Sequence, residues 1–222
     1  MSTTSARFSI GEALSSGWRA FTANIGPMAL YALVVLAVST IANLLLRDAA
    51  TQGNWLGNLV LWLINQLIAI GWLRVALDAI DGRPIDAGRI RDAFRVFVPF
   101  ALAALIFSLA VAVGLVLLVI PGIIVAVTFG FYGWVLVDGA ERDPVASLRR
   151  SAEITRGERL HLFGFGLVLL LLNLLGLLAL IVGVIVTSAV SMLALAYVYR
   201  SLAGAPATDP GGIDPGGIDR VG

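Results

Sequence analysis

Two long stretches of the chain carry no Asp, Glu, Lys or Arg, and they limit the fold more than any other feature. The first covers residues 96–137, forty-two in number, and the second covers residues 160–199, forty in number. A bilayer core is about 30 Å thick and a helix rises about 1.5 Å per residue, so roughly 20 residues cross it once. Each stretch is long enough for two crossings and has a turn signal near its middle, at Pro121-Gly122 and at Gly183. The sequence therefore predicts an all-α integral membrane protein built from helical hairpins.

The composition agrees with a membrane protein, because 59% of the residues are hydrophobic and only 13% are charged. A soluble domain has about 25% charged residues. The apolar runs predict six transmembrane helices, at about residues 25–46, 56–77, 98–119, 122–138, 161–181 and 184–200. All fifteen basic side chains are Arg. A cytoplasmic N-terminus places fourteen of them in cytoplasmic segments and only Arg47 outside, so the positive-inside rule predicts that both termini are cytoplasmic.

An internal repeat divides the chain into three units. The segments "LDAIDGRPIDAGRIRDAFRVF" (77–97) and "VDGAERDPVASLRRSAEITRG" (137–157) align at an offset of sixty. This offset pairs Asp78 with Asp138, Asp81 with Glu141, Pro84 with Pro144 and Arg89 with Arg149. We expect each unit to contain a short surface helix and a hairpin of two spans, over residues 8–80, 81–138 and 139–202. Residues 1–7 are an N-terminal tail, and the Gly/Pro-rich residues 203–222 are predicted to be disordered.

The short surface helices are predicted to be amphipathic. In the third unit, Asp143 can cap a helix that starts at Pro144 and stops near Gly157. In the first unit, Ser9 and Glu12 have the spacing of a capping box. The predicted apolar sides consist of Val145, Leu148, Ala152 and Thr155 in the third unit, and of Ile10, Ala13, Leu14, Gly17, Trp18 and Phe21 in the first.

Arginines occupy the opposite sides of these helices or flank the spans. We expect six of them to lie at the cytoplasmic membrane surface, next to anionic lipid headgroups: Arg19, Arg89, Arg95, Arg149, Arg150 and Arg156. A catalytic loop or a nucleic-acid patch is the alternative interpretation of residues 137–157. The apolar spans on both sides favour the membrane interface, so the predicted partner is the lipid bilayer and not a nucleic acid.

The sequence contains no recognisable catalytic pattern. It has no Cys, one His (His161), no nucleophile elbow and no phosphate-binding loop. Enzymatic activity, a bound cofactor and a metal site are therefore not expected. His161 stands where a surface segment enters the fifth span, and we interpret it as an interfacial ring in preference to a pH switch.

Seven polar residues near or inside the spans are candidates for a polar pathway or for ligand contacts: Asn65, Gln66, Arg74, Asp78, Asp138, Glu141 and Asn173. Structural interpretations compete with this one. Arg74 and Asp78 can pair with each other or extend to the headgroups, and interhelical hydrogen bonds of about 1 kcal/mol account for amides inside spans. Asn65 and Gln66 stand out, because neighbouring residues diverge by about 100° on a helix and need separate partners.

Several short motifs resemble those of the bacterial YciC-like six-span proteins. They are Trp18-Arg19-x-Phe21, "IPGI" (120–123), "DPVASLRRSAEITRG" (143–157) and "AYVYRSL" (196–202). The chain is also similar to the membrane domain fused to some glycerophosphodiester phosphodiesterases. The resemblance covers most of residues 8–202 and implies a multi-pass protein of the bacterial cytoplasmic (inner) membrane. It implies no catalytic or substrate-binding residues, and the chain has no room for the soluble phosphodiesterase domain.

Two functions remain open from the sequence. In the first, the hairpins bound a crevice that handles lipids or serves facilitator-type transport. In the second, the protein is a non-catalytic membrane scaffold or accessory subunit that binds a partner protein, or another copy, through its cytoplasmic helices. Units of two spans share one orientation, unlike the inverted repeats of many secondary transporters, and no charged residue is predicted in mid-membrane. Both features weigh against ion-coupled transport.

Overall fold

The computed structural model describes residues 7–51, 55–84, 90–178 and 180–204, with the side chains of 46–51, 90–93 and 180–182 excepted. Within these ranges the chain folds into helices: α1 (Ile10–Ala23), α2 (Ile25–Thr51), α3 (Trp55–Ile80), α4 (Ile90–Leu117), α5 (Val119–Phe129), α6 (Tyr132–Asp138), α7 (Pro144–Ile154), α8 (Arg159–Leu178) and α9 (Leu180–Ala203). The described part of the chain contains no strand, which confirms the all-α prediction.

Six segments are long and apolar enough to cross a membrane, as predicted. They are Ile25–Leu45, Trp55–Ile80, Phe94–Leu117, Val119–Asp138, Arg159–Leu178 and Gly183–Ala203, and each overlaps its predicted span. The fourth segment is not one continuous helix, because α5 and α6 are separated at Gly130 and Phe131. Its backbone therefore has polar groups near the break that need partners from elsewhere in the fold.

The first two spans form a hairpin that is held by an aromatic contact. The Tyr31 hydroxyl of α2 donates a hydrogen bond to the backbone carbonyl of Ile68 in α3, at 2.8 Å. The Tyr31 ring stacks on Trp72, with the ring centroids 5.1 Å apart. A side chain in place of Gly71 would collide with the Tyr31 ring, so this glycine permits the close approach of the two helices.

The α4–α5 hairpin turns three residues before the predicted position. The chain reverses at Leu118, whose backbone is extended (φ −169°, ψ 145°), and Pro121 lies in the first turn of α5. Gly122 has a different role from the predicted one. A Cβ on Gly114 would come within 2.8 Å of the Gly122 Cα, so the two glycines form the close contact between α4 and α5.

The second unit differs from its prediction, because its surface helix is not separate from the span. α4 begins at Ile90 and continues to Leu117 with Pro99 inside it. The eight residues from Ile90 to Phe97 contain neither glycine nor proline, so nothing in them favours a helix end before the span. Arg89 lies outside the described residues.

α1 packs along α9 through small residues. Ala20 is fully buried, and a Cβ on Gly17 would come within 2.8 Å of the Val190 carbonyl oxygen. Trp18, on the predicted apolar side, keeps 53% of its surface exposed, whereas Ala13 and Gly17 on that side are buried. Ser9 occupies the N-cap position, but its side chain makes no capping hydrogen bond, so the capping-box prediction is wrong. Helix packing, and not the cap, holds α1 in place.

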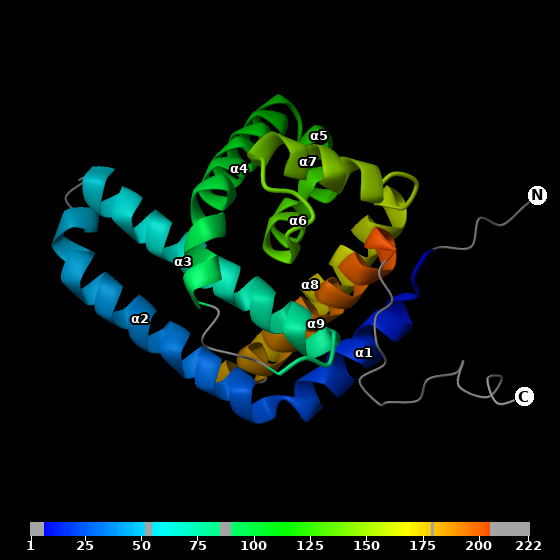
Figure 1. The fold of residues 1–222 in the computed structure, drawn as a ribbon, viewed down its shortest axis with the longest axis horizontal. Coiled ribbons are helices and arrows are strands. Elements are labelled where there is room, and N and C mark those ends of the chain that lie inside the picture. Colours follow the sequence, from blue (N-terminus) through cyan, green and yellow to red (C-terminus); the bar gives the residue numbers. More distant parts are fainter. Residues whose placement is uncertain (1–6, 52–54, 85–89, 179, 205–222) are drawn as a thin grey trace, which may run out of the picture.

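The buried apolar side chains gather around the ends of α3, α6 and α9. They come mainly from residues 70–80, 131–137 and 193–202, with additions from α1, α4 and α8. Side chains toward the far ends of the hairpins are exposed, because Leu45, Val116 and Leu178 keep 78, 87 and 77% of their surface. In Figure 1 the α2–α3 hairpin extends to the left and the α4–α5 hairpin to the top. We call the region where α3, α6 and α9 end the hub, and the opposite ends of the three hairpins the tips.

Candidate functional site

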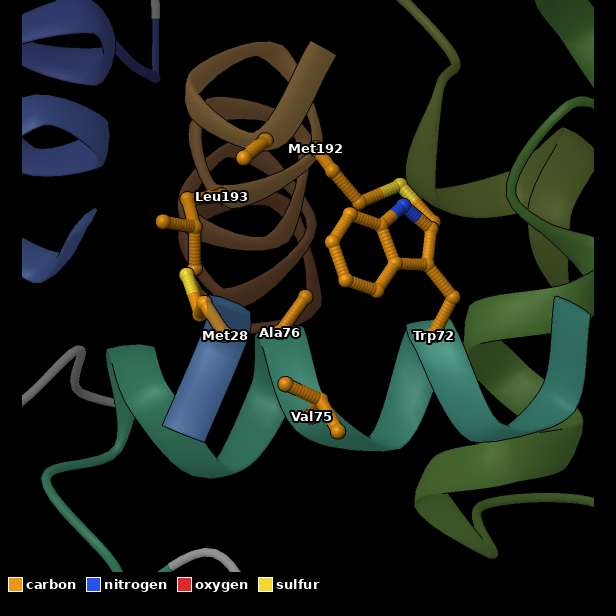
Figure 2. Close-up of a pocket in the computed structure, with 7 residues that line it drawn as sticks. Met28, Trp72, Val75, Ala76, Met192 and Leu193 are labelled. Carbon is orange, nitrogen blue, oxygen red and sulfur yellow. The ribbon is translucent and has the colours of Figure 1, made fainter. Parts of the chain in front are cut away.

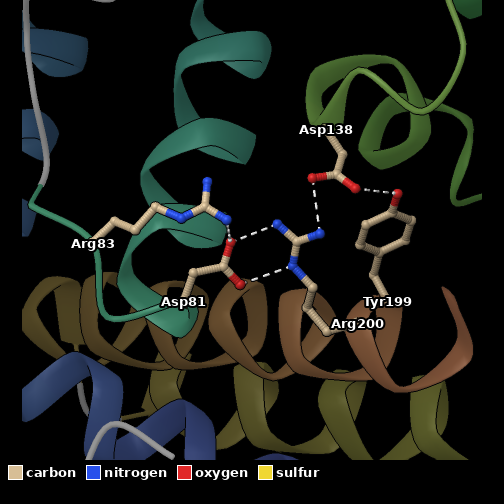
Figure 3. Close-up of polar contacts among 5 residues, drawn as sticks. All are labelled: Asp81, Arg83, Asp138, Tyr199 and Arg200. Atoms are coloured by element: carbon tan, nitrogen blue, oxygen red, sulfur yellow. Dashed lines mark hydrogen bonds and ion pairs between the residues drawn. The ribbon is translucent and has the colours of Figure 1, made fainter. Parts of the chain in front are cut away.

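Arg200, in the last turn of α9, is a buried cation at the hub, with 5% of its surface exposed. Its Nε and Nη2 atoms donate to the two carboxylate oxygens of Asp81, at 2.8 and 2.5 Å. Its Nη1 atom lies 2.8 Å from Oδ1 of Asp138. Figure 3 shows the guanidinium group between the two carboxylates. One arginine therefore bridges the ends of α3, α6 and α9.

Two further side chains complete the cluster. The Tyr199 hydroxyl donates to Oδ2 of Asp138 at 3.0 Å, and Nη2 of Arg83 lies 2.8 Å from Oδ2 of Asp81. Two arginines and two aspartates give a net charge of zero. Burying a charge costs several kcal/mol unless a well-oriented partner offsets the lost hydration, and here every carboxylate oxygen has a donor. We call Asp81, Arg83, Asp138, Tyr199 and Arg200 the hub cluster.

Both carboxylates of the hub cluster stand at the C-terminal end of a helix, directly before a glycine. Asp81 follows α3 and precedes Gly82 (φ 65°), and Asp138 ends α6 and precedes Gly139 (φ 80°). Glycine takes up positive φ without strain, so each Asp-Gly pair ends its helix. The helix dipole disfavours a carboxylate at this end, and Arg200 offsets that repulsion at both helices.

The Asp-Gly pairs change the alignment of the internal repeat. The predicted offset of sixty matches Asp78 with Asp138, but the shared contact with Arg200 makes Asp81 the counterpart of Asp138, an offset of 57 (138 − 81). Asp81, Arg83, Tyr199 and Arg200 are missing from the predicted site residues. The Asp-Gly dipeptide, present in both segments, is the signal that identifies the two carboxylates. No comparable signal in "AYVYRSL" indicates that its arginine contacts them.

α7 is held against the break between α5 and α6 by buried hydroxyl groups. Ser151 Oγ accepts from the backbone N–H of Phe131 at 3.1 Å and donates to the Thr128 carbonyl at 3.0 Å. Thr155 Oγ1 also donates to that carbonyl, at 3.2 Å. Ser151 and Thr155 are fully buried. The polar groups left by the broken span therefore find their partners on α7, which explains why α7 lies where it does.

The start of α7 follows the prediction, but its inward side does not. Asp143 is the N-cap and accepts from the Ala146 N–H at 2.8 Å, with Pro144 at the first helical position. The side that packs on the bundle consists of Ser147, Leu148, Ser151, Ile154 and Thr155. Val145, on the predicted apolar side, is 45% exposed. The apolar stripe is rotated from its predicted position, because the hydroxyl groups are needed at the break.

The outward side of α7 carries the predicted basic residues. Arg149 and Arg150 are exposed, and so is Arg156, two residues beyond the end of α7. Glu153 is exposed as well and accepts from Nη1 of Arg150 at 3.1 Å. Arg19 on α1 and Arg95 on α4 are exposed as well.

The seven polar candidates occupy separate places. Asp138 belongs to the hub cluster, and Asn173 Nδ2 donates across the α8–α9 hairpin to Ser191 Oγ at 2.8 Å. Asn65 is exposed and donates to the Leu61 carbonyl of its own helix at 2.9 Å. The others are buried or partly buried: Gln66, Arg74 and Asp78 in α3, and Glu141 between α6 and α7. Hydrogen bonds therefore join Asp138 and Asn173 to α9.

A small pocket lies beside the hub between α2, α3 and α9. Figure 2 shows Trp72 next to Met192 on one side of it and Met28 next to Leu193 on the other. Its lining is apolar, and the space is too small for a water molecule. We interpret this pocket as imperfect helix packing and not as a ligand site.

The donors and acceptors of the hub cluster bond to one another. The cluster is therefore suited to holding the ends of α3, α6 and α9 together. Among the described residues, no group of three His, Asp or Glu side chains could hold a metal ion. Comparison with known proteins found no matching family model, curated protein or solved structure. The resemblance to the YciC-like proteins therefore stays a prediction.

Proposed function

We propose that the protein is a non-catalytic membrane scaffold or accessory subunit that binds an acidic partner protein through α7. The observation that supports this proposal is the way α7 is attached to the break between α5 and α6. Its inner side is fixed by the contacts of Ser151 and Thr155 with Thr128 and Phe131, so its outer side has a set orientation. A helix whose orientation is fixed before binding loses less conformational entropy when a partner docks.

The outer side of α7 has the charge for such a partner. Three exposed arginines and one exposed glutamate give this side a net charge of +2 (3 − 1): Arg149, Arg150, Arg156 and Glu153. Exposed positive charge accelerates association with acidic surfaces and favours bidentate contacts to carboxylates. Anionic lipid headgroups offer similar chemistry, so the experiment must separate a protein partner from the lipid.

Transport or lipid handling has less support in this fold. The polar candidates that such a role would use have local partners, as Asn173 does with Ser191 and Asp138 with Arg200. Interhelical hydrogen bonds and ion pairs of this kind stabilise helix packing without any ligand.

The test is a charge reversal of α7. In native membranes, other proteins are expected to crosslink to α7. In the Arg149→Glu/Arg150→Glu/Arg156→Glu variant, we expect the yield of these crosslinks to fall by at least about tenfold. Quantitative mass spectrometry of crosslinked peptides measures this, with a photo-crosslinker placed at the exposed Val145. The control is Arg142→Glu/Arg159→Glu, because both arginines are exposed near α7 and neither belongs to the charged surface formed by Arg149, Arg150 and Arg156.

The outcomes separate the alternatives. Unchanged protein crosslinks in the triple variant would contradict the scaffold proposal. Loss of binding to vesicles with anionic lipid, without any change in protein crosslinks, would mean that α7 contacts only headgroups. A solute or lipid flux in liposomes that disappears in Asp78→Ala would favour the transport function instead.

We further propose that the protein lies in the bacterial cytoplasmic membrane with both termini in the cytoplasm. The contacts of Arg200 with Asp81 and Asp138 support this, because they bring the ends of the second, fourth and sixth spans together. The arginine-rich connections that follow two of those spans then share one side of the membrane. The chain has no Cys, so single cysteines at Arg142 and Val116 can be labelled from one side of intact membranes. Labelling of both from the same side would contradict the proposed topology.

A further inference from the structure

The tip half of α3 is the part of the hairpin that other hairpins leave uncovered. In the hub half, Trp72 lies beside Met192 of α9, and a Cβ on Gly133 of α6 would come within 3.0 Å of Leu73. In the tip half, Leu56 and Leu59 keep 51 and 43% of their surface. Figure 1 shows this half extending away from α4 to α9, with α2 alongside it.

Asn65 is an amide on this uncovered half, near the middle of the span. It follows the start of α3 by ten residues (65 − 55), which is about 15 Å along a helix and half the thickness of a bilayer core. Its side chain is exposed, and its Nδ2 atom donates to the Leu61 carbonyl at 2.9 Å. This contact uses one of the two N–H donors of the amide and neither lone pair of its oxygen. Most of the amide's hydrogen-bonding capacity is therefore unused.

An amide in this position is poorly suited to lipid. An amide has two donors and an acceptor with two lone pairs, and hydrocarbon chains offer a partner to none of them. Within the described ranges, no residue donates to the Asn65 oxygen in the structure. Another membrane-embedded polypeptide can supply the partner that hydrocarbon chains do not.

We propose that Asn65 pairs with Asn65 of a second copy, so that two α3 helices cross at their tip halves. The amide is its own complement, since the N–H of one copy can donate to the oxygen of the other across a two-fold axis. No charged residue lies between Trp55 and Leu73, so this half of α3 offers no opposite charge to a charged partner. The apolar neighbours on the same side of α3, Leu61, Ile68 and Ala69, are partly exposed and supply the surround that such a pair requires. This proposal does not depend on the binding role of α7.

The experiment measures self-association in lipid bilayers. Full-length protein carrying donor or acceptor dyes is reconstituted at increasing dilution in lipid, and energy transfer reports the dimer. An interhelical amide pair contributes about 1–2 kcal/mol, so Asn65→Leu should weaken the dimer about five- to thirty-fold. Asn65→Gln, which keeps the amide, should restore most of the affinity.

The matched control is Asn43→Leu. Asn43 is an exposed asparagine on α2 that also donates to its own helix, at 2.7 Å to Ser39, and it lies near the end of its span. This variant should leave the dimer unchanged. A wild-type protein that is monomeric at every lipid ratio would overturn the proposal, and so would an Asn65→Leu variant that associates as strongly as the wild type.

A second measurement identifies the partner. Because the chain has no Cys, Asn65→Cys gives a protein with a single thiol. Oxidation of native membranes should give a disulfide-linked dimer of twice the mass, and Leu33→Cys, on the exposed side of α2, should not. A product that joins Asn65→Cys to a different protein would show that the partner is not a second copy. Loss of partner binding at α7, with the dimer intact, would leave this inference standing.

Discussion

The first and sixth spans show opposite relations between composition and burial. In the segment Ile25–Leu45, an 18-residue stretch has a mean hydropathy of 2.2, but only 11% of that stretch is buried inside the protein. In the segment Gly183–Ala203, the corresponding stretch has a mean hydropathy of 1.5, and 50% of it is buried. In a soluble protein the more apolar helix would be the more buried one. In this protein the apolar helix is left for the lipid, and the helix with Ser191, Tyr199 and Arg200 packs against its neighbours.

The difference follows from the solvent. Lipid chains are as apolar as leucine, so burying an apolar side chain against protein gains little, whereas polar and small groups gain hydrogen bonds and close packing. α9 has both, with its ion pairs at Arg200 and its contact with Gly17 of α1. Among its described side chains, α2 makes such a contact through Tyr31. The hub should therefore carry most of the stability, and the tips should contribute little.

The largest expected effect is at Arg200. Arg200→Met leaves two carboxylates at the hub without their shared cation, and removing one partner from a buried ion pair costs about 3–5 kcal/mol. The free energy of unfolding, measured by denaturant titration in mixed micelles, should fall by this amount. Arg83→Met is the matched control and should lower the free energy of unfolding much less. The Arg83 side chain is 54% exposed and contacts one of the two carboxylates, that of Asp81.

A compensating variant keeps this prediction testable if Arg200→Met does not accumulate. Adding Asp81→Asn and Asp138→Asn removes the unpaired charges, so the triple variant should recover much of the lost stability. If Arg200→Met unfolds at the same denaturant concentration as the wild type, the hub cluster is not what joins the hairpins.

The next effect is at the break between α5 and α6. The Ser151→Ala/Thr155→Val variant leaves the Phe131 N–H and the Thr128 carbonyl buried without partners, and we expect a loss of about 3 kcal/mol. α7 should also become more accessible to protease, since its inner side would then be held by the packing of Leu148 and Ile154 without these hydrogen bonds. Ser15→Ala is the control, because Ser15 is exposed and bonds only to its own helix. If the double variant resists protease as the wild type does, packing alone is sufficient to hold α7 against the bundle.

A smaller effect is expected at the contact of α1 with α9. Gly17→Leu would collide with the Val190 carbonyl and with Ala194, and overpacking of this kind costs about 1–2 kcal/mol. A cysteine in place of Ser16, which is 2% exposed, should be protected from maleimide in the parent protein and labelled when Gly17 is leucine. Gly11→Leu, whose Cβ would meet only Ser9 Oγ, at 3.9 Å, should leave Ser16→Cys protected.

The sequence predicts the fold well, because the spans follow from a simple rule about length and polarity. The six spans and the α4–α5 hairpin agree with the structure. The break at Gly130 and the turn at Leu118 were not predicted, because both depend on tertiary contacts. α7 supplies the partners that permit the break, and the packing of Gly114 on Gly122 places the turn before Pro121.

The candidate site is less predictable. Asp138 is among the predicted polar residues, since a carboxylate at a span end is visible in the sequence. Its partners Tyr199 and Arg200 lie sixty or more residues away, and their pairing depends on how three helices cross. Local patterns such as Asp-Gly identify where a helix ends, but they do not identify which cation will lie beside it. The side of α7 that faces inward was missed for the same reason.

The smallest expected effect is at the tips, and one substitution made in two places measures it. Leu178 at the α8–α9 tip is 77% exposed, whereas Leu193 in the hub is fully buried. Leu178→Ala exchanges one lipid-facing side chain for another and should change the free energy of unfolding by less than about 0.5 kcal/mol. Leu193→Ala opens a cavity among packed helices and should cost about 2–5 kcal/mol. Equal losses would mean that the hairpin tips close against each other in the bilayer, and the contrast between hub and tips would no longer hold.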